Sequence, residues 1–97
     1  MEDSIQTILN YNTPEFNYIK LAEELAELSE VILKRYLKKE EHKPPIERVI
    51  EELGDVLLRM KVLATQEGIT FDVNARLQKK TFQILQWIDD CKYKGGA

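Results

Sequence analysis

Helix-breaking residues are few in this chain, and their positions constrain the fold more than any other feature of the sequence. The chain contains four glycines and three prolines. Thr13-Pro14 offers a helix N-cap followed by proline at the first helical position, and Pro44-Pro45 stops one helix and starts another. Gly68 is expected to end a third helix, and Thr70 to cap a fourth. The predicted helices cover residues 3–11, 14–41, 45–67 and 71–92.

The rest of the sequence favours an all-α fold. No stretch alternates apolar and polar residues with the β-branched enrichment that is typical of strands. We therefore expect one domain over residues 1–97, built as a helical bundle of about four helices. In this scheme residues 1–12 form an N-terminal segment, and residues 93–97, which include Gly95-Gly96, form a frayed tail.

The composition argues against several classes of function. The net charge of −3 disfavours binding to a nucleic-acid backbone as the main task. The N-terminus is acidic, and no run approaches the roughly 20 apolar residues of a membrane-spanning helix. The single cysteine, Cys91, cannot form an internal disulfide, and with the distant His42 it makes neither a zinc site nor a Cys/His nucleophile. We expect a cytoplasmic protein without nucleic-acid or membrane partners.

The second predicted helix carries two apolar strips, which is more than a helix with one buried side needs. The first strip is centred on Leu25, and we expect it to be the core stripe; its members are Tyr18, Leu21, Leu28, Ser29, Ile32 and Tyr36. The second strip contains Ile19, Ala26, Leu33 and Leu37. A chain of 97 residues can hardly cover both strips by itself. The sequence therefore predicts a homo-oligomer.

Charged residues repeat at matching positions on the second and third predicted helices. The second helix carries Lys20, Glu23, Glu24 and Glu27, and the third carries Arg48, Glu51, Glu52 and Asp55 at the same spacing. Relative to Leu25 and Leu53, the pairs Glu24/Glu27 and Glu52/Asp55 lie at about −100° and −160° on their helices. Antiparallel packing of the two helices would bring these four carboxylates together.

Four converging carboxylates need a counter-charge, because like charges at the edge of a core raise each other's pKa and lose hydration. Oxygen ligands select Mg²⁺, Mn²⁺ or Ca²⁺ rather than zinc. The alternative is a solvated helix surface, with Lys20–Glu24 and Arg48–Glu52 as i,i+4 ion pairs. A di-iron bundle is set aside, since it needs Glu-x-x-His and the sole histidine lies beside the diproline.

The run KLAEELAEL, followed after Pro44-Pro45 by EELGDVL, resembles the MazG-like superfamily of all-α nucleoside triphosphate pyrophosphohydrolases. The paired motif reads Glu24-Leu25-Ala26-Glu27 and Glu52-Leu53-Gly54-Asp55, and the similarity extends over about residues 12–85. The resemblance implies hydrolysis of (deoxy)nucleoside triphosphates to a monophosphate and pyrophosphate. It also implies Mg²⁺, with Mn²⁺ as a substitute, held by the four acidic residues, and a homodimer or homotetramer.

The resemblance further implies groups that bind the substrate. A basic and amide-bearing last helix should face the phosphates, and here the matching residues are Lys79 and Gln83, although relatives often have asparagine at the second position. The adjacent Lys80 leaves the register open by one residue. Gln66 stands where an arginine is common, so Lys20, Arg48 or Arg59 could take over phosphate contacts. Asn12 and Phe16 match the segment where relatives recognise the base; a surface role for the cations and a core role for Phe16 are the alternatives.

In the mechanism that we expect, one carboxylate acts as general base for attack on phosphorus. Glu23 and Glu51 are candidates for this base or for support of the ligands, and the catalytic set is Glu23, Glu24, Glu27, Glu52 and Asp55. Two other functions share the predicted fold, namely phosphoribosyl-ATP pyrophosphatase and a non-catalytic helical adaptor. The first lacks support because Asp55 is followed by VLLRMKVL rather than by a leucine–histidine run. Response to Mg²⁺ separates the adaptor from either enzyme.

Overall fold

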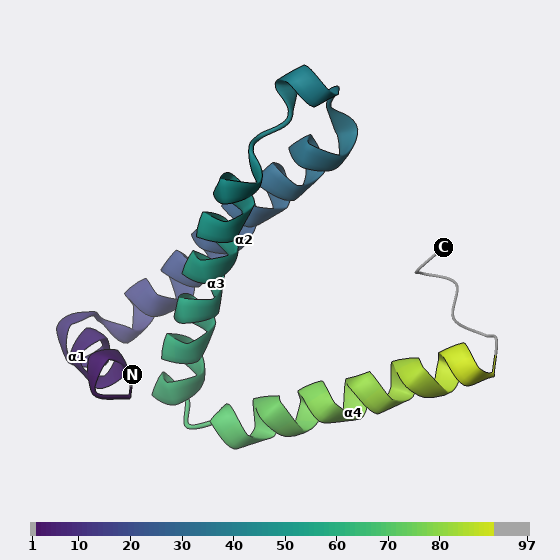
Figure 1. Ribbon diagram of the computed structural model, residues 1–97. Helices are drawn as coiled ribbons and strands as arrows, with labels where there is room; N and C mark the ends of the chain where they lie inside the picture. The colour runs from purple at the N-terminus through teal and green to yellow at the C-terminus, as the bar shows by residue number, and fades with distance from the viewer. Residues whose placement is uncertain (1, 91–97) are drawn as a thin grey trace.

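The computed structural model describes residues 2–90, and over that range the chain forms four α-helices, one 3₁₀ turn and no strand (Figure 1). The helices are α1 (Glu2–Tyr11), α2 (Pro14–Leu37), α3 (Ile46–Gln66) and α4 (Thr70–Asp89), and the 3₁₀ turn η1 covers Glu40–His42. The all-α prediction is confirmed. No helix in this range is long and apolar enough to cross a membrane. Cys91, the expected tail at 93–97 and the last two residues of the predicted fourth helix lie outside the described residues.

The start of α2 follows the predicted cap. Thr13 has extended backbone angles, its hydroxyl oxygen accepts a hydrogen bond from the Phe16 amide at 3.2 Å, and Pro14 is the first helical residue. The helix ends at Leu37, earlier than the predicted residue 41, because Lys38 adopts extended angles and the chain turns through η1. Arg35 closes this turn by donating from Nη1 to the Pro44 carbonyl at 3.0 Å.

Glycine ends α3 as predicted, but Thr70 does not cap α4. Gly68 has a φ of 67°, which is the left-handed conformation that glycine adopts without steric cost. The amides of Gly68 and Ile69 donate to the carbonyls of Thr65 and Ala64 at 3.1 and 2.9 Å, as in a Schellman motif. Because this motif uses only two residues beyond the cap, Ile69 already occupies the N-cap of α4 and Thr70 is its first helical residue.

The helices α2 and α3 form an antiparallel pair, and α1 lies against α3 near its C-terminal end (Figure 1). The buried apolar side chains are Ile5, Val31, Val56 and Val62. Three polar side chains are buried with them, namely Asn17, Glu24 and Glu52. The core of the described chain is therefore small, and it contains two carboxylates.

The apolar stripe expected as the core of α2 is largely open in the single chain. Leu25 is 44% exposed and Tyr36 is 82% exposed, although Leu21 and Leu28 are partly covered. The physical reason is that α2 meets α3 through the neighbouring register, which carries Asn17, Glu24 and Val31, while α4 runs away from the pair after Gly68 (Figure 1). The predicted burial of this stripe is thus wrong for one chain, and α4 also leaves its own apolar side chains exposed.

Candidate metal centre

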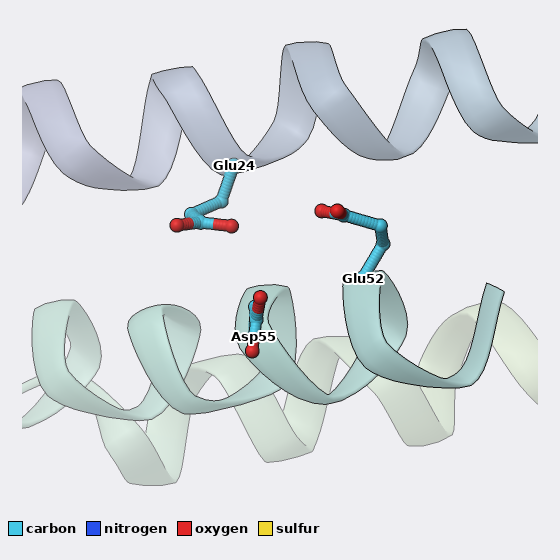
Figure 2. Close-up of side chains that lie close together, drawn as sticks. All are labelled: Glu24, Glu52 and Asp55. Atoms are coloured by element: carbon cyan, nitrogen blue, oxygen red, sulfur yellow. The ribbon is translucent and has the colours of Figure 1, made fainter. Parts of the chain in front are cut away.

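Three of the four predicted ligands converge between α2 and α3. Glu24 on α2 faces Glu52 and Asp55, which lie one turn apart on α3 (Figure 2). One carboxylate oxygen from each residue lies within 4.8 Å of the others. Glu24 and Glu52 are buried, whereas Asp55 is exposed at the opening of the cluster. The matching register of the two helices produces this convergence, since antiparallel packing places equivalent positions opposite each other.

A cation flanks each buried glutamate on its own helix. Lys20 Nζ lies 3.5 Å from Glu24 Oε1, and Arg48 Nη1 lies 2.5 Å from Glu52 Oε1. Each cation reaches only one oxygen of its carboxylate. The other oxygens, Glu24 Oε2 and Glu52 Oε2, are buried without a hydrogen-bond partner. A buried acceptor without a partner is costly, so these two oxygens mark a place where a ligand would be stabilising.

The electrostatics of Glu52 favour a further positive charge nearby. Burial raises the pKa of Glu52, and Arg48 only partly opposes this effect. The negative charges of Glu27, Asp55 and Glu24 raise the same pKa further. A divalent cation would reverse this balance, because it favours the ionised form of every carboxylate around it. The all-oxygen donor set fits Mg²⁺ or Mn²⁺.

The remaining acidic residues of the paired motif lie around the cluster. Glu27 is exposed, and its charge acts on Glu52 across the two helices, but it is not one of the three residues whose oxygens converge. Glu23 lies 3.6 Å from Lys20 and Glu51 lies 3.5 Å from Arg48, both as exposed partners of the flanking cations. The i,i+4 ion pairs that the sequence predicted, Lys20–Glu24 and Arg48–Glu52, are also present, and each engages one carboxylate oxygen of a cluster residue.

An arginine and an aromatic ring continue the site toward the start of α2. The guanidinium carbon of Arg59 lies 5.9 Å from the centre of the Phe16 ring, which is a cation–π distance. Arg59 follows Asp55 by one helical turn, and its Nη1 is buried without a hydrogen-bond partner. Phe16 is 44% exposed, so the core role considered for it does not apply in the single chain. Arg59 Nη1 thus has unpaired N–H donors that could bind an anionic ligand near the cluster.

A buried amide that the sequence analysis missed lies beyond this pair. Asn17 is 1% exposed and donates from Nδ2 to Gln66 Oε1 at 2.7 Å. Asn12 donates from its own Nδ2 to Asn17 Oδ1 at 3.4 Å. In the sequence, only the helical register could have indicated Asn17: it precedes Glu24 by two helical turns and therefore lies on the same side of α2. A single asparagine within a helix gave no other reason to select it.

The groups expected from the last helix are not at the cluster in the single chain. Lys79 and Gln83 are exposed on α4, and neither contacts the acidic residues within the described range. The neighbouring Lys80 lies 3.5 Å from Gln83 Oε1 and 4.8 Å from the centre of the Trp87 ring. Because α4 leaves the α2–α3 pair directly after Gly68, its basic residues lie on a separate arm (Figure 1).

Comparison with known proteins supports the interpretation of the paired acidic motif. The family model for the MazG nucleotide pyrophosphohydrolase domain matches residues 12–83, which include α2, α3 and most of α4. No curated protein and no solved structure matched the chain in the corresponding comparisons. The matched range covers most of the 97 residues and contains every residue of the acidic cluster. The chain belongs to the MazG nucleotide pyrophosphohydrolase domain family.

Proposed function

We propose that this chain hydrolyses nucleoside triphosphates or their deoxy forms to the nucleoside monophosphate and pyrophosphate, in a reaction that depends on Mg²⁺. The observation that carries this proposal is the acidic cluster, in which Glu24 and Glu52 each keep a buried oxygen without a partner. A helical adaptor has no need to keep two buried carboxylates opposite each other, since this arrangement lowers stability when no cation is bound.

Glu24, Glu52 and Asp55 would hold the cation, and Glu27 is proposed as the fourth ligand because its charge already acts on Glu52. A divalent cation bound there neutralises phosphate charge and lowers the pKa of a bound water. Mn²⁺ offers the same preference for oxygen and is expected to substitute.

The chain's own residues then position the substrate and accept a proton. Arg59 is proposed to bind a phosphate oxygen through its unpartnered Nη1. Lys20 stands between Glu23 and Glu24 and neutralises their charge, which lowers the repulsion that an approaching anion meets. Glu23 and Glu51 are the proposed general bases, because both are exposed carboxylates directly beside the cluster.

The active form is proposed to be a homo-oligomer, either a dimer or a tetramer. Support comes from apolar side chains that α2 and α3 leave exposed, including Leu25, Ile32, Leu53 and Leu57. The arm formed by α4 exposes a second apolar set, including Phe71, Leu77, Phe82 and Leu85. Exposed apolar surface of this extent is typical of a chain that associates with copies of itself.

The proposal is tested by incubating the eight common ribo- and deoxyribonucleoside triphosphates with the protein and Mg²⁺. Pyrophosphate and orthophosphate are measured separately. We expect pyrophosphate as the product, no release without a divalent cation, and loss of the activity in Asp55→Asn. Asp72→Asn is the matched control, because Asp72 is an exposed acid in the first turn of α4. Orthophosphate as the only product, or equal activity of both variants and the parent protein, would contradict the proposal.

A further inference from the structure

The same contact between a cation and a buried glutamate occurs on both helices of the acidic cluster. On α2, Lys20 Nζ lies 3.5 Å from Glu24 Oε1, and on α3, Arg48 Nη1 lies 2.5 Å from Glu52 Oε1. In each case the cation precedes the glutamate by four residues on its own helix, a spacing at which two side chains are neighbours. Each helix therefore supplies both members of its own contact.

The two oxygens of each buried carboxylate differ as a result. Oε1 is held by the cation, whereas Oε2 of Glu24 and of Glu52 is buried without a hydrogen-bond partner within residues 2–90. The side chains of Glu24 and Glu52 are only 10% and 2% exposed, so neither carboxylate can exchange its cation for bulk water without leaving its place. Each glutamate thus offers one free oxygen to a ligand between the helices (Figure 2).

A second, exposed carboxylate helps to hold each cation where it is. Lys20 also lies 3.6 Å from Glu23, and Arg48 also lies 3.5 Å from Glu51. A divalent ion in the cluster would repel both cations, and the attraction of the exposed carboxylate offsets part of this repulsion. The cations can therefore remain beside Glu24 and Glu52 when the cluster is occupied.

The number of oxygens that a carboxylate offers affects which divalent ion it suits. An all-oxygen donor set by itself admits Mg²⁺, Mn²⁺ and Ca²⁺. Ca²⁺ takes about six to eight oxygen ligands in a flexible arrangement, and a carboxylate can supply both of its oxygens to it. Mg²⁺ demands a near-ideal octahedron and keeps several waters. Carboxylates with one oxygen already held by a cation therefore suit Mg²⁺ better than Ca²⁺.

We infer that Lys20 and Arg48 determine the metal selectivity of the acidic cluster, because they hold one oxygen of each buried glutamate and thereby favour Mg²⁺ over Ca²⁺. Both are positioning residues, since they act on the ion through Glu24 and Glu52. This inference rests on the proposed function, because it concerns the cation of that same site.

Charge alone predicts a different result from coordination. Mg²⁺, Mn²⁺ and Ca²⁺ carry the same charge, so removal of a neighbouring cation raises the affinity for all three ions by a similar factor. Release of a second carboxylate oxygen instead favours Ca²⁺ more than Mg²⁺. The ratio of the two affinities therefore measures the coordination effect, whereas the affinity for either ion alone does not.

Displacement of Mn²⁺ from the metal-free protein measures this ratio without turnover. Bound Mn²⁺ is followed by electron paramagnetic resonance while Mg²⁺ or Ca²⁺ is added as competitor. In the parent protein we expect Mg²⁺ to displace Mn²⁺ at a lower concentration than Ca²⁺ does. Arg48→Met and Lys20→Met each keep an apolar stem without a donor, and each should lower the ratio of Mg²⁺ to Ca²⁺ affinity by roughly tenfold. Lys20→Met breaks the longer of the two contacts, so it tests the inference even if Arg48→Met does not fold.

Two further variants separate the proposed role from a general effect of charge or stability. Arg48→Lys keeps a cation and should keep the preference for Mg²⁺, since Lys20 already reaches one oxygen at the same spacing. Lys34→Met is the matched control, because Lys34 contacts Glu30 at 2.6 Å on the same helix as Lys20, but between two exposed side chains. Its ratio should equal that of the parent protein. Thermal unfolding verifies that each variant is folded.

The outcomes distinguish this inference from the proposed function. Equal gains for Mg²⁺ and Ca²⁺ in the methionine variants of Lys20 and Arg48, or a parent protein that binds Ca²⁺ as tightly as Mg²⁺, would overturn the inference and leave the proposed function intact. A change of the ratio in Lys34→Met as large as in Arg48→Met would overturn it as well. The expected ratios without hydrolysis of any triphosphate would contradict the proposed function alone. A parent protein that binds no Mn²⁺ would overturn the two together.

Discussion

Arg48 Nη1 lies 2.5 Å from Glu52 Oε1, while the second oxygen of the same carboxylate is buried without a partner. The ion pair therefore engages only one of the two carboxylate oxygens of Glu52. Burial and the neighbouring carboxylates outweigh Arg48, so the pKa of Glu52 stays above its ordinary value. The site is consequently destabilising on its own, and a bound cation would reverse this effect.

Glu52→Gln tests this relationship directly. The variant keeps the shape and one acceptor of the side chain but removes its charge from the cluster. We expect the metal-free variant to be at least as stable as the parent protein and to gain no stability from added Mg²⁺. Thermal unfolding with and without Mg²⁺ measures both effects. Stabilisation of the variant by Mg²⁺ to the same extent as the parent would show that the ion binds elsewhere.

The raised pKa of Glu52 predicts that two quantities change in opposite directions as the pH rises: the stability of the metal-free protein decreases and the affinity for Mg²⁺ increases. A carboxyl whose folded pKa is raised contributes stability below its unfolded pKa and loses it as the pH rises through the folded pKa. The metal-free protein should therefore lose this contribution as the pH rises above the ordinary glutamate range. Mg²⁺ affinity should increase over the same interval, because the ion needs the carboxylate. Unfolding scans and metal titrations at several pH values check this prediction. In Glu52→Gln, the stability and the Mg²⁺ affinity should both depend less on pH than in the parent protein.

Glu27→Gln and Asp55→Asn should both abolish turnover while the fold is kept. Each substitution removes a charge from the proposed ligand set and retains the size of the side chain. We expect rates lower by roughly 10²-fold or more, since preorganised charge at a reacting phosphate contributes on this scale. Steady-state kinetics measure the loss, and circular dichroism verifies the helices. Near-normal rates for Glu27→Gln alone would restrict the site to the three residues that already converge.

Lys79 should be needed for activity although α4 carries it away from the cluster of its own chain. Lys79→Ala is expected to lower the rate by roughly 10²–10³ through lost electrostatic stabilisation, while Lys80→Ala is tolerated. In the arrangement described, such an effect requires the helix of a second copy. Mixing Lys79→Ala with Asp55→Asn chains should then recover part of the activity, because one hybrid site regains both groups. Loss of activity in Lys80→Ala alone would show that Lys80, and not Lys79, is the lysine that faces the phosphates.

The exposed apolar residues of α2 and α3 predict association in solution. Sedimentation of the parent protein at tens of micromolar should show a dimer or a tetramer. Leu57→Glu places a charge on the exposed apolar surface of α3 and should shift the distribution toward the monomer. Lys38→Glu, at an exposed position after α2, is the charge-changing control. A parent protein that sediments only as a monomer would leave these apolar side chains unexplained.

Local rules predicted the elements of this fold better than its packing. Thr13-Pro14 and Gly68 determined two helix boundaries because capping and positive φ depend on adjacent residues alone. The convergence of Glu24 with Glu52 followed from the register that two antiparallel helices share. The cap at Thr70 was misassigned because the Schellman turn at Gly68 places Ile69 at the start of α4.

Contacts between distant segments were harder to obtain from the sequence. The pairing of Asn17 with Gln66 depends on how α2 and α3 are offset along their axes, which helical periodicity does not specify. Burial of Leu25 depends on whether α4 covers it, and no pattern in the sequence determines the direction of a helix after a glycine turn. The acidic cluster was predictable because it needs only the register, whereas the Asn17–Gln66 hydrogen bond needs the offset as well.

The acidic cluster is formed by two consecutive helices joined by a short connection, and this has a consequence for how the protein reaches its native state. Contacts between neighbours in sequence close small loops, so a hairpin of low contact order folds early and rapidly. Because Glu24 and Glu52 both lie on this helix pair, we expect their carboxylates to meet within one chain as the pair folds. If the cluster binds a cation as proposed, cations in the refolding medium should affect this step, whereas protein concentration should affect only the proposed association of chains.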